Sequence, residues 1–241
     1  MKLLLGLLLS LCVLIPFNQE QSVENKTIVY LIPGQGSDYR LYKNLTLDNN
    51  FETRHIKYHT PEKGSTMAEF AKALSSQIDT SKKFVLVGVS LGGMLATEMT
   101  SFIDPQKVII ISSAKSRNEL PLRYRFQKKL PLYKILTPKM AQRGALFLQP
   151  IVEPDSKKDR DTFKSMLKDK DPKFLRRTIQ MIMSWERESV PNGIIHIHGD
   201  NDHTIPLKNV SPDYVIENGS HMMALTRGEE LSELINEILK E

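Results

Sequence analysis

Cysteine is nearly absent from this chain of 241 residues, in which Cys12 is the only one. A disulfide within the chain is therefore excluded, and so is a zinc site built from thiolates. The net charge is also small, at +5. An excess of this size does not indicate a nucleic-acid partner. Long apolar runs are missing as well: the run at residues 3–15 is shorter than the about 20 residues that a membrane-spanning helix needs.

The first residues differ from the rest of the chain. Lys2 precedes the apolar run at residues 3–15 and a proline follows it, which is the pattern of a signal peptide. We therefore predict a signal peptide or N-terminal anchor over residues 1–21. The protein is then exported to the periplasm or the extracellular space, or is anchored in a membrane through this segment. A lipoprotein signal at Cys12 is a further alternative, although bulky Leu11 stands where such signals have a small residue.

The composition is that of a globular protein, with 40% hydrophobic and 25% charged residues, and residues 22–241 are long enough for one domain. Apolar or alternating runs predict strands at residues 27–32, 51–58, 84–89, 108–111, 194–198 and 214–216. Helical spacing predicts helices at residues 67–78, 91–102, 174–185 and 229–239. Alternating strands and helices predict an α/β fold with a mostly parallel central sheet flanked by helices.

Residues 114–190 interrupt this alternation. They combine several prolines, many basic residues and helical stretches, and we interpret them as an inserted helical lid. Basic side chains gather near its start, with aromatic and leucine side chains between them, at Arg123, Arg125, Lys128, Lys129 and Lys134. A solvated helix face is the simpler explanation. Peripheral contact with an anionic membrane, through this lid or through the N-terminal segment, is the alternative.

The pentapeptide Gly88-Val89-Ser90-Leu91-Gly92 stands between a predicted buried strand and a predicted helix. This context is the one that a nucleophile elbow requires, because a sharp turn there lifts a serine hydroxyl clear of the sheet. Side chains at positions 88 and 92 would collide in such a turn, and glycine has none. The N-terminus of the following helix also directs its dipole at Ser90. We therefore predict Ser90 as a nucleophile.

A serine hydroxyl needs a base to accept its proton, and the base needs an acid to orient it. His221 follows the last predicted strand, while Asp200 and Asp202 both follow the strand at residues 194–198. All of them stand at carboxyl ends of strands, where open α/β sheets place their sites. Ser90, an aspartate and His221 then follow one another in the order Ser, Asp, His. The residues alone leave both aspartates as candidates, since Asp200 can instead cap the turn.

The chain from Thr27 onwards resembles the α/β-hydrolase superfamily, in particular its small bacterial serine esterases and lipase-like members. The resemblance rests on the elbow around Ser90, on His198-Gly199-Asp200-Asn201-Asp202, and on Gly219-Ser220-His221. It implies that Asp202 is the catalytic acid, because the family pattern is His-Gly-x-x-Asp. It also implies an oxyanion hole made by the backbone N–H groups of Leu91 and Gln35. Pro33 stands where the family usually has histidine, which is a departure in the loop that carries Gln35.

These features predict a serine hydrolase that cleaves carboxylic esters of small-molecule substrates through an acyl-enzyme intermediate. No cofactor or metal is implied, because the triad supplies nucleophile, base and electrostatic stabilisation. His196 and His198 share a face of one strand, which favours one histidine in the core and one bracing a loop over a metal site. Acyl transfer, thioester hydrolysis and peptide cleavage by the same triad stay open, and so does a non-catalytic binding protein on a hydrolase scaffold.

Overall fold

A computed structural model of the protein describes residues 26–126 and 157–241, and a few positions between them at 137, 139–140, 143–144 and 147. The predicted leader, residues 1–21, and the middle of the predicted lid lie outside the described residues. Within these residues no helix is both long and apolar enough to cross a bilayer.

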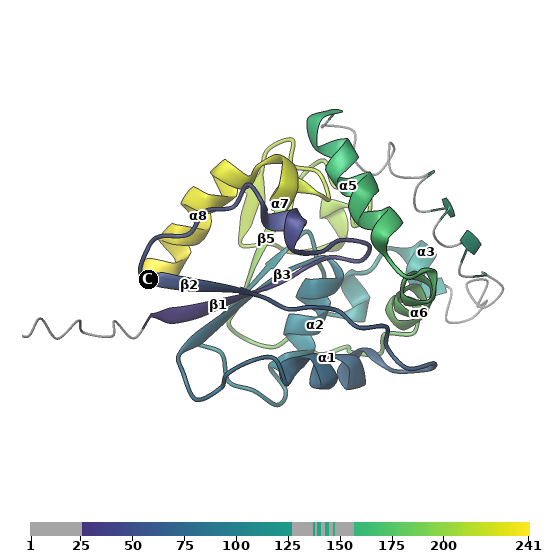
Figure 1. Ribbon diagram of the computed structural model, residues 1–241, viewed down its shortest axis with the longest axis horizontal. Helices are drawn as coiled ribbons and strands as arrows, with labels where there is room; N and C mark the ends of the chain where they lie inside the picture. The colour runs from purple at the N-terminus through teal and green to yellow at the C-terminus, as the bar shows by residue number, and fades with distance from the viewer. Residues whose placement is uncertain (1–25, 127–136, 138, 141–142, 145–146, 148–156) are drawn as a thin grey trace, which may run out of the picture.

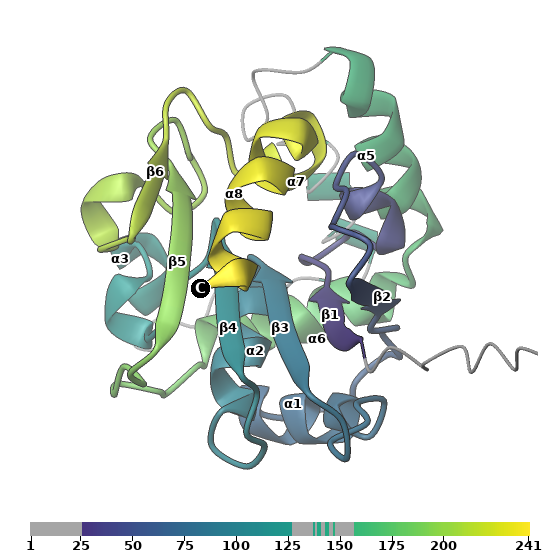
Figure 2. The same ribbon diagram turned by 90° about the vertical axis from the view of Figure 1, so that its left-hand side faces the viewer.

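The centre of the fold is a six-stranded sheet in which every pair of neighbouring strands is parallel. Its strands are β1 (Thr27–Ile32), β2 (Phe51–His55), β3 (Phe84–Val89), β4 (Lys107–Ile111), β5 (Ile194–Gly199) and β6 (Tyr214–Ile216). They lie in the order β2-β1-β3-β4-β5-β6, which can be followed across Figure 2. All six residues of β3 are buried, as expected for a central strand covered on both faces. The predicted strands are confirmed, although β2 ends at His55 rather than at residue 58.

Helices cover both faces of this sheet, as the alternating sequence predicted (Figure 1). One face packs against α1 (Met67–Ser75), α2 (Leu91–Met99) and α6 (Pro172–Met183). The other packs against η1 (Tyr39–Tyr42), α7 (Met223–Thr226) and α8 (Gly228–Lys240). Side chains of each strand alternate between the two cores because the period of a strand is two residues.

Helix α1 begins as its sequence predicted and ends earlier. Thr66 accepts a hydrogen bond from the Glu69 N–H and its own N–H donates to the Glu69 carboxylate, so the capping box is present. The prediction extended this helix to Ile78. It ends at Ser75, because the N–H groups of Gln77 and Ile78 bond to carbonyls three residues back and tighten the last turn.

The segment between β4 and β5 contains η2 (Arg117–Glu119), α3 (Leu122–Arg125), α5 (Lys157–Asp169) and α6. Its described parts thus include helices, as the sequence predicted, whereas residues 184–193 before β5 contain none. Leu167 of α5 and Leu175 of α6 are buried in the core beside the loop that follows β1. The action of this segment as a lid stays a prediction.

The order of the strands defines a topological switch point. The chain leaves β1 to form β2 on one side and returns to form β3 on the other side. The connections at the carboxyl ends of β1 and β3 therefore diverge, and ligands of open α/β sheets bind at such a switch point. Ser90 follows β3, and residues 33–37 follow β1, so both predicted parts of the site lie at this position.

Candidate active site

Ser90 stands in a strained turn between β3 and α2. Its backbone has φ 53° and ψ −118°, a conformation that residues other than glycine rarely adopt. Its N–H donates to the Ile111 carbonyl at 2.9 Å, which ties the turn to the end of β4. The residue as a whole is partly exposed.

The glycines of the elbow are required by close backbone contacts. A Cβ added at Gly88 would overlap the carbonyl oxygen of Gly92, as expected for residues that flank the turn. A Cβ added at Gly92 would instead overlap the carbonyl of Ile32 at the end of β1. At Gly93 it would lie 2.6 Å from Cβ of Ser113. At these three positions the turn therefore packs without space for a side chain, against β1 at Gly92 and against the residue pair after β4 at Gly93.

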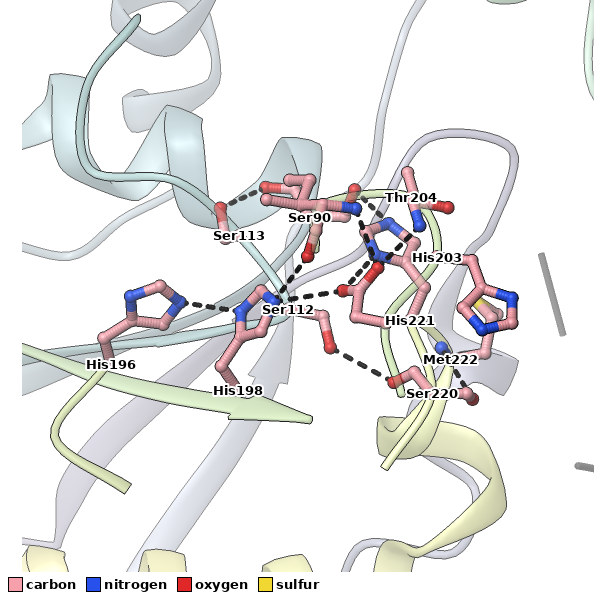
Figure 3. Close-up of polar contacts among 12 residues, drawn as sticks. Ser90, Ser112, Ser113, His196, His198, His203, Thr204, Ser220, His221 and Met222 are labelled. Atoms are coloured by element: carbon pink, nitrogen blue, oxygen red, sulfur yellow. Dashed lines mark hydrogen bonds and ion pairs between the residues drawn. The ribbon is translucent and has the colours of Figure 1, made fainter. Parts of the chain in front are cut away.

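The structure brings Ser90, His221 and Asp202 into one chain of hydrogen bonds, part of which is drawn in Figure 3. His221 Nε2 lies 2.9 Å from Ser90 Oγ, and His221 Nδ1 lies 2.7 Å from Asp202 Oδ2. An ionised carboxylate only accepts, so the proton of a neutral His221 is on Nδ1. Nε2 then carries the lone pair that accepts the serine hydroxyl, and this is the tautomer that a general base needs.

Asp202 is held in a single orientation. It is 2% exposed, and its Oδ1 accepts from the N–H groups of Thr204 and Ile205, both at 2.8 Å. Burial raises the pKa of this carboxyl, but the electrostatic interactions with His221 and His198 and the hydrogen bonds from the His221 ring and the Ile205 N–H outweigh it, so the pKa is lowered. Asp202 is therefore ionised at neutral pH.

Asp200 has a different position from Asp202. It is exposed, and its Oδ1 accepts from the Asn218 N–H at 2.6 Å. It therefore joins the loop after β5 to the loop after β6, which is the turn-capping role considered for it. Of the two aspartates, Asp202 is the one that lies against His221.

His196 and His198 lie side by side in the interior, both with no exposed surface (Figure 3). His198 Nε2 lies 2.8 Å from the Ile205 carbonyl, which can only accept, so this nitrogen carries the proton. His198 Nδ1 then accepts from His196 Nε2 at 3.0 Å. Burial is the main cause that lowers the pKa of both rings, for His196 to about 2. One histidine is thus in the core and the other braces the loop of Asp202, whose Oδ2 lies 3.4 Å from His198 Nε2.

The loop after β1 lies directly against Ser90. A Cβ added at Gly34 would be 3.4 Å from Cβ of Ser90. Hydrogen bonds from two tyrosines hold the start of this loop, from buried Tyr42 to the Ile32 carbonyl at 2.7 Å and from partly buried Tyr58 to the Pro33 carbonyl at 2.5 Å. These bonds fix the start of the loop, in which Pro33 stands at the position where the α/β-hydrolase pattern usually has histidine.

The two predicted oxyanion donors are both free to donate. Among the described residues, neither the N–H of Gln35 nor that of Leu91 has an acceptor. The Leu91 N–H is at the first residue of α2, directly after Ser90, and the Gln35 N–H follows Gly34, the residue of the β1 loop that lies against Ser90. Their role as an oxyanion hole is part of the proposal made below.

Several residues around the site were not singled out from the sequence. Ser113 donates to the Ser90 carbonyl at 2.7 Å, and its place directly after β4 was the available signal. Tyr58 carried no signal, because its hydrogen bond to the Pro33 carbonyl joins residues 25 positions apart. Trp185 stands two residues after the end of α6. It is 2% exposed and donates to Glu98 at 2.7 Å, which is a core position.

Metal ligands are not grouped in the described part of the chain, where no cluster of three or more histidine, cysteine, aspartate or glutamate side chains is placed to hold a metal ion.

Comparisons with known proteins agree with this architecture. The sequence profile of UPF0227, an uncharacterised protein family, matches residues 42–120, which is about a third of the chain. No curated protein sequence matches.

Solved structures match nearly the whole chain. An esterase from Thermogutta terrifontis is 15% identical with a TM-score of 0.67, and the match covers 89% of both chains. An enol-lactonase from Burkholderia xenovorans is 13% identical with a TM-score of 0.66, over 90% of this chain and 92% of that one. A bromoperoxidase from Bacillus anthracis is 17% identical with a TM-score of 0.67, over 90% and 92%.

The sheet order, the elbow at Ser90 and these structural neighbours define the class: the chain has the α/β-hydrolase fold. This confirms the fold inferred from the three sequence motifs. Identities of this size establish the fold alone, so the reaction has to be argued from the site.

Proposed function

We propose that the protein is a serine hydrolase that cleaves carboxylic esters, with Ser90 as nucleophile, His221 as general base and Asp202 as the acid that orients it. The observation that carries this proposal is the continuous contact from Ser90 Oγ to His221 Nε2 at 2.9 Å and from His221 Nδ1 to Asp202 Oδ2 at 2.7 Å. The strained backbone of Ser90 supports it, because strain of this kind is kept where function requires it.

The reaction follows from the protonation states. Ser90 Oγ attacks the ester carbonyl carbon while its proton passes to His221 Nε2, and Asp202 stabilises the imidazolium that forms. The N–H groups of Leu91 and Gln35 donate to the negative oxygen of the tetrahedral intermediate. The intermediate collapses, and the leaving alkoxide takes the proton from His221. Water, deprotonated by the same nitrogen, then attacks the acyl-enzyme and releases the carboxylic acid and free Ser90.

The choice of an ester is supported by structural neighbours that are named as an esterase and as an enol-lactonase, since a lactone is a cyclic ester. The name of the bromoperoxidase neighbour is a reminder that this fold hosts other chemistry. Thioester hydrolysis, acyl transfer and peptide cleavage would use the same triad. A small-molecule ester is therefore the proposed substrate class.

The test is hydrolysis of p-nitrophenyl esters from acetate to palmitate, by wild-type protein and by Ser90→Ala. Loss of turnover in Ser90→Ala, with full activity in the exposed-serine control Ser76→Ala, would support the proposal. Full turnover by Ser90→Ala would refute the mechanism. If no ester is turned over but a phosphonate probe still labels Ser90, the reaction is thioester hydrolysis, amide cleavage or acyl transfer. Folded protein that is not labelled at all would indicate a binding protein.

We also propose that residues 1–21 direct export or anchor the protein in a membrane, with peripheral contact to an anionic membrane, through this segment or through the basic lid, as the alternative to a solvated lid face. The support is the sequence pattern of these segments. Fractionation of cells that produce the full chain tests the first part, and recovery in the cytosol with residues 1–21 intact would refute it. Sedimentation with anionic but not with neutral vesicles tests the second part.

A further inference from the structure

The β1 loop, residues 33–37, lies between the nucleophile and the helices of the segment that precedes β5. On one side, Gly34 faces Ser90. On the other side, a Cβ added at Gly36 would lie 2.7 Å from Leu167 Cδ1 of α5 and 3.7 Å from Leu175 Cδ2 of α6. The loop that carries one proposed oxyanion donor is therefore in direct contact with α5 and α6.

The side chain of Gln35 connects this loop to α6 by hydrogen bonds. Its Nε2 donates to Thr178 Oγ1 at 2.9 Å and to the Leu175 carbonyl at 3.1 Å. A carbonyl can only accept, so the nitrogen end of the amide faces α6 and both of its protons are used. Thr178 has no exposed surface, and its hydroxyl donates to carbonyls of its own helix, at 2.9 Å for Phe174. Its oxygen is thereby oriented to accept from Gln35.

Helix α6 is in turn fixed to the segment that follows β2. Asp171 Oδ2, at the N-cap of α6, accepts from Thr60 Oγ1 at 2.8 Å, and Arg177 donates to the Pro61 carbonyl at 2.5 Å. The ring of Tyr58 stacks on Phe174 of α6 at 5.4 Å between centroids, while its hydroxyl bonds to the β1 loop at Pro33. The β1 loop and α6 are therefore joined through two separate sets of contacts, of which only Gln35 carries a proposed catalytic N–H.

We propose that Thr178 is a positioning residue for the oxyanion hole: it anchors the side chain of Gln35 and so holds the N–H of the same residue in line with the oxyanion. This inference rests on the proposed function. An oxyanion hole acts by geometry, because its donors must already point to where the negative charge develops. Loss of the Thr178 acceptor leaves Gln35 Nε2 held by the Leu175 carbonyl alone. The N–H of Gln35 is kept but is positioned less firmly, so an interaction made only in the transition state is weakened. Turnover then falls while binding of the ground state is kept.

The experiment compares Thr178→Val, which keeps the shape and removes the acceptor, with Thr178→Ser, which restores a hydroxyl. The control is Thr97→Val. Thr97 is also fully buried in a helix and donates to the carbonyl four residues back, Gly93, at 2.9 Å, but it has no bond to the β1 loop. We expect Thr178→Val to lower kcat by about tenfold, less than the loss of a whole oxyanion donor, with KM changed by no more than about twofold. Thr178→Ser should recover most of kcat, and Thr97→Val should keep it.

Two outcomes would overturn the proposal. One is a wild-type kcat in Thr178→Val, and the other is an equal fall of kcat in Thr97→Val, which would indicate a general effect of a buried threonine. If Thr178→Val does not fold, Gln35→Met is measured instead, because it removes the anchor and keeps the backbone N–H. The same fall in kcat is expected there, and wild-type turnover would again contradict the anchor.

The rate at which a phosphonate labels Ser90 separates this inference from the proposed function. The phosphoryl oxygen of the probe occupies the oxyanion position, so Thr178→Val should be labelled about tenfold more slowly than wild type. Labelling at the wild-type rate refutes the anchor and leaves the proposed function standing. Wild-type protein that neither hydrolyses esters nor is labelled refutes the proposed function itself.

Discussion

Replacement of Asp202 by asparagine would test the site at the level of single protons. In the native protein, Asp202 Oδ1 accepts from two backbone N–H groups, those of Thr204 and Ile205, both at 2.8 Å. An asparagine at this position must place its carbonyl oxygen there, because an NH2 group cannot accept. Its NH2 group is then forced into the position of Oδ2, where it faces His221 Nδ1.

This forced orientation reverses the tautomer of His221. The NH2 group donates, so Nδ1 must accept and the proton of the neutral ring moves to Nε2, which faces Ser90 Oγ at 2.9 Å in the native protein. Nε2 can then no longer accept the serine proton. In chymotrypsin-type triads this exchange lowers kcat by about 10⁴-fold, or about 5.5 kcal/mol of transition-state stabilisation. We expect Asp202→Asn to show a loss of that order.

The matched control is Asp200→Asn, the same substitution two residues earlier, at the exposed side chain that bonds only to the loop of Asn218. It should keep kcat within about threefold of the wild type. The assay is kcat for the best p-nitrophenyl ester, with folding checked by circular dichroism. Equal losses in both variants, or an Asp202→Asn enzyme within about tenfold of wild type, would refute the assignment of the acid and the tautomer argument together.

Three further predictions concern stability and use thermal or urea unfolding. The lowered pKa of His196, about 2 against about 6.5 unfolded, means that the unfolded chain binds more protons between these values. The contribution of His196 to stability is therefore full above pH 6.5 and is lost on acidification, by about 2 kcal/mol at pH 5. His196→Phe should flatten this pH dependence of the free energy of unfolding. An unchanged pH slope in the variant would contradict a neutral buried ring. Gly92→Ala places a Cβ against a carbonyl of β1 and should destabilise the folded protein by about 1–3 kcal/mol or more. The control Gly144→Ala, at a position where an added Cβ has nothing within 4 Å, should not destabilise it. Similar unfolding of both variants would contradict the close contact at Gly92. Ser90→Gly relieves a positive φ and should unfold at a higher temperature than the equally inactive Ser90→Ala; the reverse order would show that the elbow is not strained.

Much of the fold followed from local patterns in the sequence. Residues 84–89 were predicted as a central strand because they are continuously apolar, and β3 is that strand. Helical spacing predicted a helix that starts at residue 67, and α1 starts there, directly after the capping box of Thr66 and Glu69. The elbow was readable for a steric reason, since Gly88, Ser90 and Gly92 occupy positions that only these small residues tolerate. These signals are local, so a single sequence contains them in full.

The tertiary structure decided which groups touch. Asp200 and Asp202 follow the same strand, and only the positions of the loops after β5 and β6 place Asp202 against His221. The partners of His196 and His198, and hence their protonation, depended in the same way on the fold.

The connection between Gln35 and Thr178 joins residues 143 positions apart, and it depends on where α6 packs across the end of the sheet. The sequence by itself determined the chemical groups, the strand ends that carry them and their order along the chain. Their distances and tautomers, and the anchor of the β1 loop, arose only when side chains distant in sequence were packed into one core, because no local pattern records a contact between segments that fold against each other.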